Sequence, residues 1–455
     1  MAATSATSPT RLPGPALARL AATRPVPGDL ALLRRAVDDR RLVLLKALHT
    51  RLRRPPDAVG PEARRAFEAH WDLLARAEAR RPRAARAALG YPTVGARLVA
   101  ALRAADGAGL ERALTAFGAT ASAVALRTGT PFTADLATEA GVLALPGVGV
   151  LHTPASRVRV DAWRGGAWLA PVGRPAGVGL LRVPGPGGGP VLRGAGPGWR
   201  QPARFPASGV RLEDVDPFRV PPGGVGLPTG TPRPAAERPE SAAHPWAARW
   251  RAALALLLTA DPVRAAEATA LLRAVVPLSA TPCGGGPAVH GEALSATARA
   301  MPGALLTTWP GSPAELAAVV VHETHHTKLD LVHDLVPLLD DGGGPPGATT
   351  SPDPGRRLHT VGWRTDPRPL RGVLHGTYAH LALADLWARL ARGAGAPERF
   401  RRTARERHER CWEQVGEALP ILLNSAELTY AGREFTKGMS EYHRSLGNRP
   451  GLTRG

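Results

Sequence analysis

The segment Ser312–Leu335 constrains the fold of this chain more than any other, because it predicts one long amphipathic helix that carries a metal-binding pattern. Its start has three helix signals: a serine cap at Ser312, a proline at the first helical position, and Glu315 in the first turn. Apolar residues then recur at helical spacing until Pro337 ends the pattern. The helix prediction is therefore independent of the motif inside it.

Residues 322–326 of this segment read His-Glu-Thr-His-His, an H-E-x-x-H pattern. His322 and His326 are four residues apart, so both side chains lie on one helix face and can bind a single metal ion. Glu323 projects about 100° round from His322, near enough to act on a metal-bound water or to orient a ligand. A polar, solvated helix turn is the alternative, but the capped amphipathic surroundings favour metal binding.

The charge of the chain raises the question of nucleic-acid binding. The chain has 58 Lys and Arg residues against 38 Asp and Glu residues, a formal net charge of +20. Arginine supplies almost all of the positive charge and is spread along the chain, and only 5% of residues are aromatic, which leaves few rings for stacking bases. We therefore expect no nucleic-acid partner, whereas acidic ligands such as a dicarboxylate or an acidic peptide fit the charge.

Three features bear on the cellular compartment. The chain starts without the basic and apolar segments of a signal peptide. No apolar run comes close to the length of about 18 residues that a membrane span needs. Its cysteines, Cys283 and Cys411, are too few for a disulfide framework or a cysteine-based zinc ribbon. We expect a cytoplasmic protein with no membrane association.

Apolar periodicity divides the chain into four regions. Residues 1–28 are rich in Pro, Ala and Thr and are expected to be disordered. Residues 29–135 have helical spacing, whereas residues 136–235 contain short Val and Leu runs between Gly and Pro clusters, typical of strands and turns. Residues 236–445 return to helical spacing and contain the motif. We predict a mainly helical α+β protein: a helical N-terminal region, a β-rich central insertion and a helical H-E-x-x-H metal-binding catalytic domain.

A catalytic metal needs a third protein ligand. The extended metzincin pattern would require glycine and histidine where this chain has Leu329 and Val332, so that protease class is excluded. His333 lies on nearly the same helix face as His322 but three turns away, which favours an outer or solvated position. Carboxylates of the C-terminal helices remain alternatives: Glu409, Glu413 and Glu427.

His375 is the leading candidate for the third ligand. It lies within Leu370–Leu390, an apolar helix-like segment that could run antiparallel to the motif helix or cross it. His380 is five positions further on, about 140° round an ideal helix, so at most one of the two should reach the metal. On the pattern alone, a core histidine is the alternative for His375.

Three arginines lead into this segment: Arg364, Arg368 and Arg371. Guanidinium groups bind carboxylates bidentately, so near a metal they suit a carboxylate-bearing cosubstrate or a peptide terminus. In a chain this rich in arginine, a solvent-facing loop is the alternative.

Three blocks of sequence occur in this order: LAAVVVHETHHTKLDLVHDLVPLL, VGWRTDPRPLRGVLHGTYAHLALADLW and ELTYAGREFTKGM. Together they resemble the actinobacterial HExxH-motif peptide-modification family, whose members occur free-standing or fused to radical-SAM maturases in ribosomal peptide pathways. The resemblance covers residues 245–440 well. The pattern W-R-x-D-P-R-P-L ahead of H-G is far more specific than H-E-x-x-H alone.

The resemblance implies an iron(II)- and 2-oxoglutarate-dependent peptide β-hydroxylase with a fold unlike the usual double-stranded β-helix oxygenases. It implies iron ligation by His322 and His326, with His375 third, and a ribosomal precursor peptide as substrate, with a radical-SAM maturase as a further partner. The candidates for the cosubstrate carboxylate are Arg364, Arg368 and Arg371. His325 departs from the family pattern, in which a longer neutral polar residue is expected; it should face away from the metal and matter little.

The residues alone leave other functions open. A zinc peptidase would keep one open coordination position for water and use Glu323 as general base. An iron oxygenase needs three open positions, two for chelating 2-oxoglutarate and one for dioxygen, and Glu323 would then orient a ligand or touch the substrate. An inactive binding protein of a peptide-maturation complex is the third possibility. The resemblance favours the oxygenase, although the common iron triad of two histidines and one carboxylate leaves the third ligand open.

Overall fold

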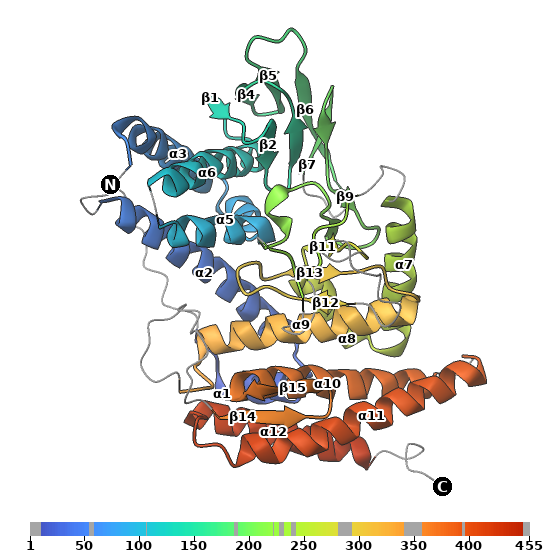
Figure 1. Ribbon diagram of the computed structural model, residues 1–455. Coiled ribbons are helices and arrows are strands. Elements are labelled where there is room, and N and C mark those ends of the chain that lie inside the picture. The colour runs from blue at the N-terminus through green and yellow to red at the C-terminus, as the bar shows by residue number, and fades with distance from the viewer. Residues whose placement is uncertain are drawn as a thin grey trace.

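The computed structural model describes residues 11–53, 59–105, 107–185, 190–221, 223–226, 232–237, 243–280, 294–340, 357–393 and 396–448. Within these residues the chain forms twelve α-helices and several small sheets, with 56% helix and 19% strand (Figure 1). The predicted mainly helical α+β class is confirmed.

The N-terminal part is helical: α1 (Gly14–Ala21), α2 (Pro27–Arg53), α3 (Pro61–Arg80), α4 (Pro82–Leu89), α5 (Pro92–Arg103) and α6 (Gly107–Thr128). Proline stands in the first turn of most of these helices, where its missing N–H costs no intrahelical bond. The expectation that residues 1–28 are disordered is wrong for α1, because Leu20 and Ala21 are fully buried and α1 packs on the C-terminal helix α12 (Tyr430–Gly447). Residues 1–10 lie outside the described residues.

An antiparallel sheet with strand order β1-β4-β5-β6-β7 follows the helices. Its strands are β1 (Phe132–Ala137), β4 (Arg157–Trp163), β5 (Gly166–Pro171), β6 (Val178–Pro184) and β7 (Pro190–Ala195). Alternate residues such as Val160 and its partner Leu169 are buried, so one face packs against the core. A smaller sheet adds β2 (Val142–Leu145), β3 (Gly149–His152) and β8 (Trp199–Arg200).

A second five-stranded sheet, of order β12-β13-β11-β10-β9, connects the β-rich region to the C-terminal helices. Its strands are β9 (Ala203–Arg204), β10 (Arg211–Leu212), β11 (Ala274–Pro277), β12 (Ser295–Ala296) and β13 (Ala304–Thr307). The helices α7 (Ala243–Ala260) and α8 (Pro262–Leu271) precede β11. Strand β13 leads directly into the motif helix α9 (Pro313–Leu335), so this sheet fixes where that helix begins.

The C-terminal helices α10 (Leu370–Ala391), α11 (Glu398–Leu423) and α12 form a layer beside α9, with the hairpin of β14 (Leu358–Val361) and β15 (Arg364–Pro369) next to α10 (Figure 1). α9 and α10 run antiparallel, since Arg371 contacts Asp330 while His375 contacts His326. Among the described residues, no helix combines the length and apolar character needed to cross a membrane.

Two large hydrophobic cores run across the regions defined from the sequence. One joins α1 and the first half of α2 with α7–α12, and the other joins the second half of α2 with α3–α6 and the first sheet. Because α2 has 27 residues, it is about 40 Å long and belongs to both cores. The metal motif is therefore held by the first core, to which both ends of the chain contribute.

Candidate metal centre

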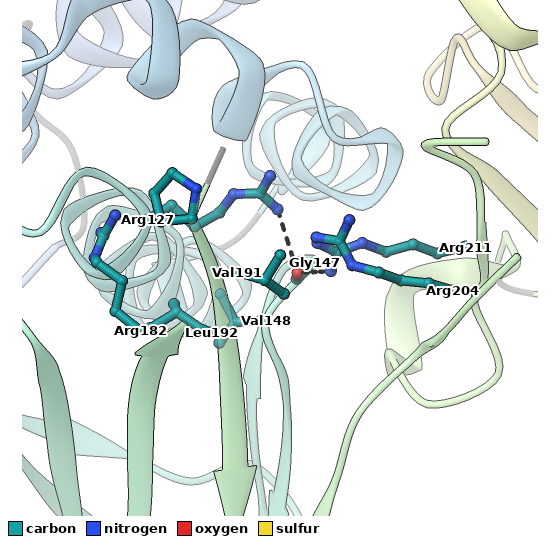
Figure 2. Close-up of a pocket in the computed structure, with 9 residues that line it drawn as sticks. Arg127, Gly147, Val148, Arg182, Val191, Leu192, Arg204 and Arg211 are labelled. Carbon is teal, nitrogen blue, oxygen red and sulfur yellow. Dashed lines mark hydrogen bonds between the residues drawn. The ribbon is translucent and has the colours of Figure 1, made fainter. Parts of the chain in front are cut away.

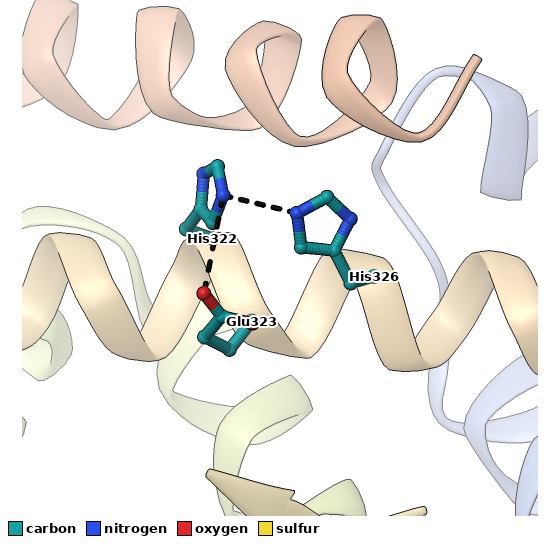
Figure 3. A group of neighbouring side chains, drawn as sticks. All are labelled: His322, Glu323 and His326. Carbon is teal, nitrogen blue, oxygen red and sulfur yellow. Dashed lines mark hydrogen bonds and ion pairs between the residues drawn. The ribbon is translucent and has the colours of Figure 1, made fainter. Parts of the chain in front are cut away.

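The start of α9 has the cap geometry that its sequence predicts. The Ser312 side chain accepts a hydrogen bond from the Glu315 backbone N–H at 3.1 Å, and the Glu315 carboxylate accepts one from Gly311 N–H at 2.6 Å. Val320 and Val321, in the turn of α9 before the motif, are buried. This fixed start directs the side chains of His322 and His326 toward α10, as Figure 3 shows.

The two motif histidines form a close pair. Their Nε2 atoms are 3.0 Å apart, and one ligand atom from each of His322, Glu323 and His326 lies within 4.8 Å of the others. Imidazole nitrogens bind zinc at about 2.0–2.1 Å, so two nitrogens on one ion are at most about 4 Å apart. The pair therefore satisfies the spacing that one shared ion requires.

The protonation of the pair also suits a metal. Burial lowers the pKa of His322 well below its usual value, and the neighbouring His326 and His380 lower it further. Burial lowers the pKa of His326 to about 3, with His375 and His380 acting in the same direction. Both rings are neutral at pH 7, which is the state that metal ligation requires.

His375 lies against this pair, on α10. Its Nδ1 is 3.4 Å from Nδ1 of His326, and its Nε2 is 3.5 Å from the Asp330 carboxylate. Burial lowers the pKa of His375 to about 3, and the charge of Arg371 acts in the same direction. His326 presents Nε2 to His322 but Nδ1 to His375, so His375 adjoins the three-residue group without being part of it.

Asp330 is a residue of this site that the sequence reasoning missed. A carboxylate behind a metal-ligating histidine fixes the ring's proton and its orientation. Asp330 stands in this relation to His375, since it faces the nitrogen of that ring that points away from His326. The signal was present in the sequence, because Asp330 follows His326 by four residues and so shares its helix face.

His380 also contacts the pair. Its ring centroid is 5.5 Å from that of His322, and its ring stacks on Trp363 at 4.7 Å. Its Nδ1 donates to the Gly376 carbonyl at 2.8 Å. α10 presents the arc between His375 and His380 to α9, so each ring meets a different motif histidine: His380 lies beside His322, and His375 lies beside His326. The prediction that at most one of them reaches the metal stays a prediction.

Glu323 lies on the other side of α9 from α10 (Figure 3). Its side chain is buried, and its Oε1 accepts a hydrogen bond from the Ser295 hydroxyl at 2.7 Å and lies 3.9 Å from His322 Nε2. Burial raises the pKa of Glu323 to about 7, while hydrogen bonds from Ser295 and Thr297 oppose the rise. Oε2 is buried without a hydrogen-bond partner among the described residues. An unsatisfied carboxylate oxygen beside two neutral imidazoles fits a bound cation or a metal-bound water.

The three candidate arginines separate into two groups. Arg364 and Arg368 lie on β15 and both face Asp366, at 2.8 and 3.3 Å. Arg371, on α10, instead donates to Asp330 at 3.1 Å and lies 3.4 Å from Nε2 of His333. The structure thus connects Arg371, through Asp330, to the histidine cluster.

The remaining candidate ligands lie apart from the three-residue group. His333 accepts a hydrogen bond from Leu338 N–H at 3.2 Å and faces Arg371, consistent with the expected outer position. Of the carboxylates considered as alternatives, two are on α11 and one precedes α12, and none belongs to the described three-residue group: Glu409, Glu413 and Glu427.

Neither the protein-family models nor the curated proteins contain a match to this chain.

His325 faces away from the pair, as expected, but it is fully buried in an ionic network behind α9. Its Nδ1 donates to the Val321 carbonyl at 2.7 Å, and its Nε2 lies 2.9 Å from Arg264 and 3.1 Å from Lys328. Both of these cations pair with Glu267. The expectation that position 325 matters little rested on its direction alone, and the network gives it a structural role on the opposite face of the motif helix.

Substitution at His375 and His380 tests the third ligand. Loss of an outer-shell partner typically weakens metal affinity about 10- to 100-fold, and we expect an effect of this size for Asp330→Asn. His375→Ala should weaken metal retention by more than this. His380→Ala should have a smaller effect, because its Nδ1 is already bonded to Gly376. Metal stoichiometry and electron paramagnetic resonance of the iron–nitrosyl complex measure the effects of these substitutions. Wild-type retention in His375→Ala would identify a different third ligand, with Glu323 the first to examine.

Proposed function

We propose that this chain is a cytoplasmic iron(II)- and 2-oxoglutarate-dependent oxygenase that hydroxylates the β-carbon of a residue in a ribosomally made precursor peptide. In this proposal His322 and His326 hold the iron, and His375 would complete the set by turning its ring from its place beside His326 Nδ1 toward the ion shared by the two Nε2 atoms. Arg371 binds the carboxylate of 2-oxoglutarate that does not chelate the iron. Iron with 2-oxoglutarate would supply the dioxygen chemistry, in which one oxygen atom enters the peptide and the other converts 2-oxoglutarate to succinate and carbon dioxide.

The observation that carries the proposal is the guanidinium of Arg371 beside the histidine cluster. It is bonded to Asp330, whose carboxylate also faces His375. The side chains of Arg371, His375 and Asp330 are 28%, 19% and 18% exposed, so a small dicarboxylate can reach them. A guanidinium carries five donors, so Arg371 can bind an incoming carboxylate while it keeps Asp330. A zinc peptidase would need such a group only to bind a peptide terminus.

The protein's own residues have separable tasks in this proposal. The neutral rings of His322 and His326 provide lone pairs from one rigid helix, and Asp330 keeps the His375 proton on the ring nitrogen farther from the pair. Glu323, buried and bonded to Ser295, holds or accepts a proton next to His322. The His380 ring, stacked on Trp363, lies against His322 on one side of the pair.

A second candidate function has a specific observation in its favour. A zinc peptidase requires a general base with a pKa near the working pH, and burial raises the pKa of Glu323 to about 7. Its Oε1 lies 3.9 Å from His322 Nε2, within reach of a water shared with an ion at the pair. The two functions therefore depend on different residues: the oxygenase needs Arg371 to bind its cosubstrate, and the peptidase needs Glu323 as its general base.

Turnover assays separate the two functions. Protein loaded anaerobically with iron, then given 2-oxoglutarate, dioxygen and synthetic precursor peptides, should release succinate and add one oxygen atom to the peptide, whereas the zinc-loaded protein should do neither. Mass spectrometry follows the peptide. Peptide-bond cleavage by the zinc form without an oxygen gain would establish the peptidase instead, and no turnover by folded protein with either metal would leave a binding role.

Arg371→Gln provides the matched test of the cosubstrate site. Losing a charge-assisted contact of about 1.5–3 kcal/mol should raise the KM for 2-oxoglutarate about 10- to 100-fold. Arg364→Gln removes the same charge from a side chain paired with Asp366 on the hairpin and should leave that KM nearly unchanged. Equal effects of the two substitutions would remove Arg371 from the proposed site.

A further inference from the structure

A second cluster of functional groups lines a pocket between α6 and the central sheets (Figure 2). The space among its lining residues is about 290 Å³ and includes open solvent. Four arginines from four elements line it: Arg127 near the end of α6, Arg182 on β6, Arg204 on β9 and Arg211 on β10. Apolar residues such as Val148 and Leu192 complete the wall.

Two of these guanidinium groups meet at one backbone carbonyl, and a third lies next to them. Gly147, in the turn between β2 and β3, has a φ of +64°, a conformation that glycine adopts without strain. Its carbonyl accepts hydrogen bonds from Arg211 and from Arg127, the latter at 3.3 Å. In Figure 2 the side chain of Arg204 lies beside that of Arg211 and points toward the same carbonyl. Each guanidinium group has five N–H donors, so most of the donors around this neutral carbonyl are left for a ligand.

The cluster has no acidic counterpart in the part of the chain that the structure describes. None of the four arginines forms an ion pair with a described Asp or Glu, and a buried nitrogen of Arg182 has no hydrogen-bond partner there. Burial and the neighbouring guanidinium groups lower the pKa of Arg127 to about 9 and that of Arg204 to about 10. Arg127 and Arg204 remain positively charged at pH 7, so the repulsion between them stays uncompensated.

Like charges that are partly withdrawn from water are costly unless a counter-charge joins them. A carboxylate or phosphate group would neutralise them and accept several of their free N–H donors, for which the planar guanidinium fork is well shaped. We propose that this pocket is a binding site for an oxyanion, a carboxylate or phosphate group, held by Arg127, Arg204 and Arg211.

This site is separate from the candidate metal centre. Strand β9, which carries Arg204, forms one edge of the second sheet, with β10 and its Arg211 next to it, and β12, whose Ser295 bonds to Glu323, forms the other edge. Steps of about 4.8 Å between neighbouring strands place β12 about 14 Å from β10 and about 19 Å from β9. A ligand of the size of 2-oxoglutarate cannot occupy both sites, so the anion bound here is a different molecule or a remote part of a longer one.

Thermal unfolding and titration calorimetry of the full chain test the proposal with four probes at equal ionic strength: sodium phosphate, sodium acetate, a triglutamate peptide and sodium chloride. We expect phosphate or triglutamate to raise Tm beyond the chloride reference, since a ligand of the folded state stabilises it. A response to phosphate alone would identify a small free anion as the ligand, and a response to triglutamate would identify an acidic peptide segment.

Arg204→Gln assigns the binding to this pocket. Arg204 is exposed and makes no described hydrogen bond, so its loss should leave folding intact while weakening the affinity for the anion by about tenfold or more. Arg200→Gln, on β8, removes an exposed charge outside the pocket and should keep the affinity within about twofold of the wild type. The proposal is overturned if no anion stabilises the protein beyond chloride, or if Arg204→Gln binds as tightly as the wild type.

Discussion

Replacing either His322 or His326 by alanine should reduce the metal content of the protein from one ion per chain to almost none. The two Nε2 atoms are 3.0 Å apart on one rigid helix, and burial keeps both rings neutral, so each supplies a lone pair with little reorganisation. Removing one ligand should lower the affinity for the metal by far more than the loss of an outer-shell partner, which costs about 10- to 100-fold. Elemental analysis after anaerobic loading with iron, or with zinc, measures the loss.

A matched control is available on the same helix. His333→Ala also removes an imidazole from α9, but its ring faces Arg371 and Leu338 rather than the pair, so one ion per chain should remain. Circular dichroism checks that the variants are folded. If the alanine variant at position 326 does not fold, His326→Gln replaces it, because glutamine keeps a polar side chain of similar length. Full metal content in folded variants at both motif positions would refute the metal site.

Local sequence signals were sufficient to predict the motif helix and its histidine pair. The cap at Ser312 and the spacing of His322 and His326 act within one or two helical turns, so their geometry depends little on the rest of the chain. The helical character of residues 370–391 was predictable for the same reason. The packing of α10 against the motif helix was also expected, and the structure shows the antiparallel arrangement. Which motif histidine each of His375 and His380 contacts was not predictable, because a helical angle relates two side chains to each other and not to a partner helix.

Features formed by distant segments could not be predicted. Arg24 and Asp385 are 361 residues apart in sequence and form an ion pair. The Pro-, Ala- and Thr-rich composition of residues 1–28 predicts disorder, but the short helix α1 is ordered by burial of Leu20 against the C-terminal helices. The four arginines of the pocket come from four elements, and in a chain with so many arginines no local pattern distinguishes them.

The second large effect is expected at Arg264, on α8. Its guanidinium is fully buried, 2.9 Å from Glu267 and 3.5 Å from Asp385, and it also reaches Nε2 of His325 at 2.9 Å. Arg264→Ala would leave these buried carboxylates with fewer cations and open a cavity behind α9. Breaking a buried ion pair by removing one partner lowers the free energy of unfolding by about 3–5 kcal/mol. Chemical denaturation followed by circular dichroism measures this difference.

An exposed ion pair provides the comparison for Arg264. Arg401 and Glu398 are 2.6 Å apart on α11, but their side chains are 37% and 63% exposed, so Arg401→Ala should change the free energy of unfolding by at most about 1 kcal/mol. Because His325 adjoins His326 on α9, Arg264→Ala should also weaken metal retention, whereas Arg401→Ala should not. If Arg264→Ala were as mild as Arg401→Ala, the buried network would contribute little to stability, and the orientation of the motif helix would have to depend on the hydrophobic core alone.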